Sequence, residues 1–144
     1  MTDADEFAIA DTLDRMLLWA RRKAPPRLSA TSITTLDTLG LHGPQRISDL
    51  AAGEGVSQPG MTTLVSRLVD EGLAERFADP TDGRATLVRI TDTGRSVLAD
   101  RHRARTEAIR ADILRLSAEH RAALLGALDA LNHLCASSDR GTSR

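Results

Sequence analysis

The chain has 144 residues, of which 41% are hydrophobic, and this size and composition suit one globular domain that buries its own core. Its formal net charge of −1 argues against a generally basic nucleic-acid coat, and an aromatic content of 2% argues against single-strand binding by base stacking. A net charge near zero is still compatible with binding to duplex DNA, provided that arginines are clustered at the binding surface.

The remaining composition narrows the functional class. The single cysteine, Cys135, cannot form an internal disulfide, which fits a reducing cytosol. The acidic N-terminus lacks a signal-peptide pattern, and no apolar run approaches membrane-spanning length, so we predict a cytoplasmic protein that makes no membrane contact. The histidines match no metal-ligand spacing, and phosphate loops, nucleophile elbows and paired catalytic carboxylates are absent from the sequence. We therefore predict no metal, no cofactor and no enzymatic activity.

Two helices are predicted in the first third of the chain. Residues 6–23 have apolar side chains at helical spacing, and Pro25 and Pro26 end the pattern. Met16 and Trp19 of this helix are expected in a core or dimer interface, although an effector pocket beside the helix would also use them. Ser29 is placed to cap a second helix that ends near Gly43.

Two short helical patterns follow, over residues 45–53 and 58–71, separated by a tight turn in which Gly55 supplies a left-handed residue. Ser57 is placed to cap the second helix, and Gly72 to end it. The exposed face of this second helix is short or polar and able to reach base edges or phosphates: Ser57, Gln58, Gly60, Thr62, Thr63, Ser66 and Arg67. A helical hairpin with a solvated polar face is the plainer interpretation.

A β-hairpin is predicted next, with strands over 73–77 and 85–91 and a turn-rich tip over 79–84. Arg84 at the tip suits a narrow, electronegative minor groove, and Asp82 is placed to fix its guanidinium by a charge-assisted bond. The alternative is a surface turn with an ordinary ion pair. The order helix, turn, helix, hairpin is that of a winged helix-turn-helix.

Two more helices complete the prediction. Thr91 can cap a long helix over 92–116, and Ser117 a last helix over 117–136, followed by a flexible tail over 137–144. The last helix carries one apolar stripe, formed by Leu124, Leu128, Leu131 and Leu134.

Residues 47–94 resemble the central signature of the MarR family of transcription regulators. The family's L-x-x-x-G-L run corresponds to Leu68–Leu73, its D-x-R wing to Asp82–Arg84, and its L-T-x-x-G helix start to Ile90–Gly94, with isoleucine in place of leucine. Glu54 departs from the family by standing where an aliphatic residue is usual. The resemblance implies a mainly α (α+β) fold, a winged helix-turn-helix with a two-stranded wing over 29–91, a connecting helix over 92–116 and dimerisation helices over 6–28 and 117–136.

The same resemblance implies a homodimer that binds a pseudo-palindromic DNA operator, usually as a repressor. The implied dimer interface uses Phe7 and Leu13 together with the C-terminal leucine stripe. Many members release DNA when a small phenolic or other lipophilic anion binds, and some sense oxidants through a cysteine near the N-terminus. This chain has no cysteine there, and we expect Cys135 to be a buried structural thiol.

Two alternatives remain open at this stage. The winged helix could serve only as a protein-interaction module, although Arg67 and Arg84 on its two DNA-facing elements count against that. A redox-switched regulator that uses Cys135 is the other alternative.

Overall fold

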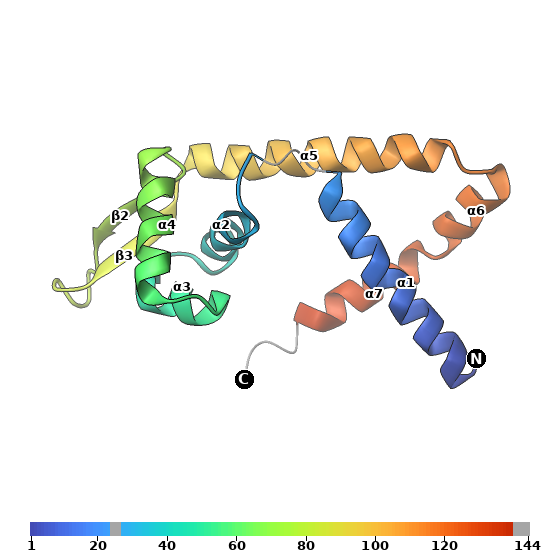
Figure 1. Cartoon of the computed structure of the whole chain (residues 1–144), viewed down its shortest axis with the longest axis horizontal. Helices are drawn as coiled ribbons and strands as arrows, with labels where there is room; N and C mark the ends of the chain where they lie inside the picture. The colour runs from blue at the N-terminus through green and yellow to red at the C-terminus, as the bar shows by residue number, and fades with distance from the viewer. Residues whose placement is uncertain (24–26, 140–144) are drawn as a thin grey trace. The chain divides into compact units, whose positions relative to one another are not determined.

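The computed structural model describes residues 1–23 and 27–139, which form helices and one small sheet (Figure 1). The chain divides into two compact units, Met1–Arg105 and Thr106–Arg144. The helices of the described residues are α1 (Asp3–Arg22), α2 (Ala30–His42), α3 (Ile47–Glu54), α4 (Gln58–Asp70), α5 (Asp92–Leu114), α6 (Ala118–Gly126) and α7 (Leu128–Asp139). The strands are β1 (Gln45–Arg46), β2 (Ala74–Ala78) and β3 (Thr86–Ile90). The predicted mainly α winged helix-turn-helix is confirmed.

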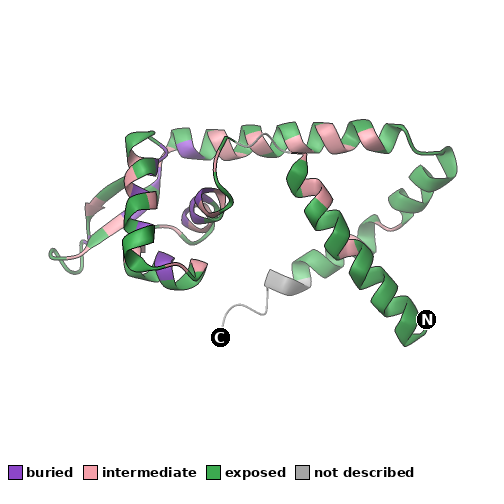
Figure 2. Cartoon of the chain, in the orientation of Figure 1, coloured by how far each residue is buried: buried purple, intermediate pink, exposed green. Residues whose placement is uncertain are grey.

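The core of the first unit lies where α2, α3 and α4 meet the sheet (Figure 2). Helices α3 and α4 pack against each other, α2 packs on β3, and α4 packs on β2. The helices contribute Leu36, Leu39, Leu50, Ala51, Met61, Val65 and Leu68, and the sheet side contributes Leu73, Ala74, Val88 and Ile90. Removing these side chains from water is the main force that holds α4 in place.

The ends of the two helix-turn-helix elements are set by local chemistry, as predicted. The Ser57 hydroxyl accepts the N–H of Gly60 at the start of α4. Gly55 and Gly72 have φ values of 65° and 73°, a left-handed conformation that favours glycine. The Leu73 N–H donates to the Leu68 carbonyl at 2.8 Å, which closes the C-terminus of α4.

The sheet has three antiparallel strands in the order β1-β3-β2, whereas a two-stranded wing was predicted. The hairpin of β2 and β3 is the wing, and Gln45 and Arg46 of β1 pair with Val88 and Leu87. The predicted helix over 45–53 is therefore wrong at its first two residues. Helix α3 instead continues through Glu54, whose carboxylate accepts the Thr38 hydroxyl at 3.3 Å.

The wing joins α5 through a compact corner. Thr91 donates its N–H to the Leu73 carbonyl and its hydroxyl to the Gly72 carbonyl, while the same hydroxyl oxygen accepts the N–H of Gly94. A Cβ on Gly94 would overlap the Leu73 carbonyl oxygen and the Ile90 side chain. Only glycine therefore allows α5 to begin this close to the end of α4.

The terminal elements differ from their predicted bounds. Helix α1 begins at Asp3, because Thr2 and Asp5 form a capping box. The single helix predicted over 117–136 is two helices, α6 and α7, separated at Ala127 next to the weak helix former Gly126. Residues 137–139 of the predicted tail belong to α7, and 140–144 lie outside the described residues. In the described ranges, no helix has the length and apolar character needed to cross a membrane.

Candidate nucleic-acid interface

Helix α4 has one buried face and one polar face. Met61, Val65 and Leu68 point into the core and are fully buried. Of the residues predicted to contact DNA, Ser66 is half-buried and the others are exposed: Ser57, Gln58, Gly60, Thr62, Thr63 and Arg67. The structure therefore presents the predicted residues together on the surface of one helix.

Three of the four hydroxyl groups on this face are already engaged as donors. The Thr62 hydroxyl donates to the Gln58 carbonyl, that of Thr63 to the Pro59 carbonyl, and that of Ser66 to the Thr62 carbonyl. A hydroxyl that has donated its proton still has lone pairs that accept hydrogen bonds. The longer side chains of Gln58 and Arg67 have no polar partner among the described residues, so their N–H groups are available as donors on this face.

The wing is anchored at the start of its tip loop by Asp79, a nearly buried carboxylate that is 7% exposed. It accepts the hydroxyl of Thr81 at 2.7 Å, the N–H of Thr81 at 2.9 Å and Nη2 of Arg46 at 2.9 Å. These bonds, those from Thr81 first, lower the pKa of Asp79 from 3.8 to about 2. Because Arg46 belongs to β1, the ion pair joins the wing to the segment that enters α3.

The wing tip is ordered by main-chain bonds. The Asp82 carboxylate accepts the N–H of Arg84 at 3.2 Å, and Asp79 and Ala85 close the loop by a main-chain bond of 2.9 Å. Asp82 was predicted to fix the Arg84 guanidinium, but its carboxylate binds the main chain instead. The guanidinium of Arg84 is exposed and has no partner among the described residues.

A further arginine, Arg76 of β2, lies against α4. Its Nη2 donates to Oγ of Ser66 at 2.9 Å and lies 3.5 Å from the Thr62 carbonyl oxygen. Arg46, Arg76 and Asp79 were all missed as interface residues from the sequence. Their partners lie 33 and 10 residues away along the chain, and such separations leave no periodic signal.

The outer face of the wing carries an arginine whose charge is neutralised. Nε of Arg89 lies 2.6 Å from a Glu75 carboxylate oxygen, and its guanidinium stacks 4.8 Å from the centroid of the Phe77 ring. This face therefore offers a paired cation, in contrast to Arg84 at the tip.

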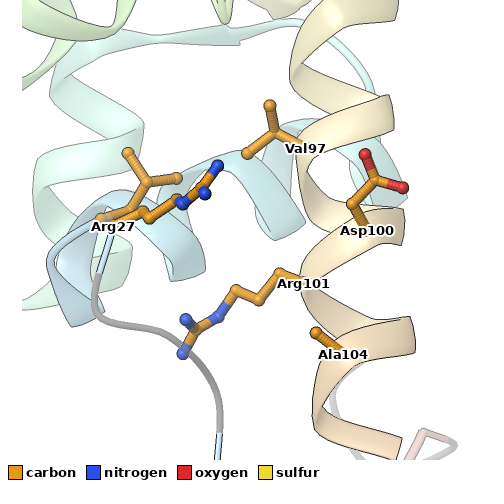
Figure 3. Close-up of a pocket in the computed structure, with 6 residues that line it drawn as sticks. Arg27, Val97, Asp100, Arg101 and Ala104 are labelled. Atoms are coloured by element: carbon orange, nitrogen blue, oxygen red, sulfur yellow. The ribbon is translucent and has the colours of Figure 1, made fainter. Parts of the chain in front are cut away.

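The first unit also has a cavity of about 280 Å³, lined by Arg27, Leu28, Val97, Asp100, Arg101 and Ala104 (Figure 3). A second cavity of about 340 Å³ lies beside it and shares Arg101; Asp37, His102 and Arg105 also line it. Burial raises the pKa of Asp37, and the nearby Arg105 and Arg101 oppose that shift. Met16 and Trp19, the predicted effector-pocket residues, line neither cavity; Met16 is exposed, and Trp19 is half-buried with Lys23 over its ring.

The predicted dimer-interface residues are largely exposed in the single chain. Phe7, Leu124, Leu128 and Leu134 are exposed, and Leu13 and Leu131 are half-buried. Cys135 is exposed as well, so the expectation of a buried thiol is wrong for the single chain. Its neighbours on α7 are exposed too, because the described part of the second unit has no buried core against which they could pack.

Comparison with known proteins finds a family of transcription regulators with the same fold. The family model described as "MarR family" matches residues 28–86. An uncharacterized HTH-type transcriptional regulator of Mycobacterium leprae is 31% identical over 140 residues, covering 93% of this chain and 96% of the relative. The HTH-type transcriptional repressor NicR of Pseudomonas putida is 28% identical over 81 residues, covering 56% of this chain and 51% of the relative. A transcriptional regulator of Thermotoga maritima has the same fold, with a TM-score of 0.78, 24% identity and coverage of 95% and 98% of the two chains.

Proposed function

The chain belongs to the MarR family of DNA-binding transcription regulators, and from this premise we propose that it is a repressor that binds a pseudo-palindromic operator as a homodimer. The observation that carries the proposal is the pair of unpartnered arginines on the two DNA-facing elements, Arg67 on α4 and Arg84 on the wing, as judged over the described residues. Both are exposed. A regulator of this kind acts in the cytoplasm, where it meets the operator.

A dimer is needed because one recognition helix supplies only half of the contacts. Two α4 helices on one face of the duplex enter successive major grooves about 10 base pairs apart, which requires a pseudo-palindromic site. Arg84 then contacts the flanking minor groove, where negative potential is strongest in narrow A·T-rich segments. The helix-turn-helix reads sequence through Gln58 and Arg67, whose side chains have free donors.

A dimer bound to an operator within a promoter would block transcription from that promoter, which is repression. NicR, which is 28% identical to this chain over 81 residues, is named as a repressor, and this supports the same sign of regulation here. The winged helix used only as a protein-interaction module is the competing hypothesis. It does not explain why a chain of formal net charge −1 places unpaired guanidinium groups on α4 and the wing tip.

We further propose that a small anion with an apolar body binds the cavity lined by Arg27 and Arg101 and relieves repression. Leu28, Val97 and Ala104 supply apolar wall, and the Arg27 guanidinium favours a carboxylate or phenolate (Figure 3). Release of DNA requires that the anion bind the DNA-incompetent form more tightly than the competent form. A thermal-shift comparison of aromatic acids with their neutral amides tests this, with Arg27→Ala as the control that should abolish the shift.

The central experiment is selection of operator DNA from a random duplex pool, followed by a gel shift at several salt concentrations. We expect a pseudo-palindromic site bound by a dimer, with affinity that falls as salt rises. Failure of the wild-type chain to retain any duplex at low salt would favour the protein-interaction module. Loss of binding in peroxide that Cys135→Ser prevents would favour the redox-switched alternative.

A further inference from the structure

Arg76 is placed by the sheet register beside the recognition helix. It pairs with Val88 across the wing, and residues two apart on a strand share a face. Arg76 therefore shares the face of the sheet that carries buried Ala74 and Val88, the face that packs on α4. It lies beyond the edge of the core and is itself exposed.

The guanidinium of Arg76 is held in one orientation by α4. Ser66 donates its hydroxyl proton to the Thr62 carbonyl at 2.9 Å, so its oxygen is left to accept Nη2 of Arg76, also at 2.9 Å. The Thr62 carbonyl is a second, longer contact at 3.5 Å. One flank of α4 carries three residues spaced four apart, Gln58, Thr62 and Ser66. Arg76 of the wing lies against the Ser66 end of this flank.

The charge of Arg76 is not neutralised by this arrangement. Both of its contacts are uncharged oxygens, whereas Arg46 and Arg89 each face a carboxylate. A guanidinium has five N–H donors, and those of Nε and Nη1 have no partner within the described ranges. An oriented and unneutralised guanidinium is suited to an anion, and its planar fork matches a phosphate bidentately.

We propose that Arg76 binds a phosphate of the DNA backbone between the groove read by α4 and the groove entered by the wing, and that Ser66 holds Arg76 and does not read a base. This inference rests on the proposed DNA-binding function. It changes the role assigned to Ser66, whose proton and one of whose two acceptor lone pairs are engaged within the protein. Because Arg76 of β2 is bonded to Ser66 of α4, DNA binding would then depend on how the wing is positioned against α4.

The test is the salt dependence of affinity for the selected operator and for a random duplex, measured by fluorescence anisotropy. Arg76→Gln keeps an N–H donor for Ser66 but removes the charge. Loss of one phosphate contact in each protomer should lower the slope of log K against log salt by roughly 2 per dimer. It should weaken operator and random duplex about equally, by roughly tenfold or more for a charged hydrogen bond. Arg76→Lys keeps the charge and should restore most of the slope.

Arg89→Gln is the matched control, because Arg89 lies on the opposite face of the same hairpin and is paired with Glu75. Its slope should equal that of the wild type. An unchanged slope for Arg76→Gln at wild-type melting temperature would overturn the proposal, as would an equal loss in Arg89→Gln. A wild-type chain that binds neither duplex would instead refute the proposed function.

The role of Ser66 is tested by combining substitutions. Ser66→Ala should weaken binding in the wild-type background and have no further effect in Arg76→Gln, because Ser66 acts through Arg76. A remaining effect that is confined to the operator and absent on the random duplex would show that Ser66 reads a base, and would overturn this half of the proposal.

Discussion

Two aspartates of the wing have carboxylates that bind main-chain amides, and together they determine where Arg84 stands. Asp79 accepts the N–H of Thr81, and Asp82 accepts the N–H of Arg84. Such Asx turns fix a loop at low entropic cost, because the side chain bonds its own neighbourhood. Arg84 thus has an ordered backbone and a guanidinium that is free to enter a groove.

Arg84→Ala is expected to weaken operator binding by roughly 1–3 kcal/mol, the usual size of one positioned arginine contact. The fold should be unaffected, because the side chain is exposed and makes no contact that stabilises the loop. A gel shift and a thermal melt on the same sample measure both effects, with Arg89→Ala as the control. Wild-type affinity in the Arg84→Ala variant would remove the wing tip from the mechanism.

The anchor at Asp79 makes a prediction about acid. The pKa of this carboxyl is lowered from 3.8 to about 2, so the charged form is favoured in the folded state. Its stabilisation is complete above the unfolded pKa and is lost as pH falls through the folded value, which places the loss between pH 3.8 and about 2.

Asp79→Asn keeps an oxygen that accepts from Thr81 but loses the charge. The melting temperature of the wild type should therefore fall more steeply than that of Asp79→Asn below pH 3.8. Above that pH the wild type should be the more stable of the two. Parallel curves for the two proteins across this range would show that the charge of Asp79 contributes nothing to the fold.

At the scale of elements, the corner between α4, β3 and α5 has no room for a side chain at position 94. Gly94 lies buried there, and the atom nearest to an added methyl group would be the main-chain oxygen of Leu73, which cannot rotate aside as the end of a flexible side chain could. Gly94→Ala should destabilise the protein by about 2 kcal/mol or more, since overpacking against fixed atoms displaces backbone.

Gly53→Ala is the opposite case. Gly53 lies in α3, and a Cβ there would meet nothing within 4 Å. Alanine is the better helix former by about 1 kcal/mol, so this variant should be slightly more stable than the wild type. Urea unfolding measures the free energy of unfolding of both variants, which should fall in Gly94→Ala and rise slightly in Gly53→Ala. Equal free energies of unfolding for Gly94→Ala and Gly53→Ala would show that the corner at Gly94 can relax to admit a methyl group.

The elements also show which features a sequence can predict. Ser29, Ser57, Gly55 and Gly72 act on neighbours within a few residues, and each was placed correctly. Strand β1 was missed because its two residues are defined only by partners some forty positions later. The Arg46–Asp79 pair and the Arg76–Ser66 contact have the same origin: folding brings together side chains that no local pattern relates.

At the scale of the whole molecule, the described part of the second unit has no core of its own. No residue is buried in its described part up to position 136, and Leu125, Leu128 and Leu134 are 70%, 49% and 51% exposed. Helix α1 likewise has no buried residue, and Phe7 is 78% exposed. Exposed apolar surface of this extent costs roughly 25 cal/mol for each Å² that remains in water. Pairing with a second copy of the chain would remove that cost.

Leu128→Asp is expected to break the proposed dimer, because it places a charge in an apolar seam without a partner. Monomer formation and loss of specific DNA binding should appear together, since a single α4 supplies half of the operator contacts. Sedimentation and gel shift on one sample measure both, and circular dichroism should show that the first unit keeps its helices. Leu41→Asp is the control, because Leu41 is 81% exposed on α2 and is not part of the leucine stripe. A Leu128→Asp protein that stays dimeric and binds its operator would show that the interface uses another face of α6 and α7.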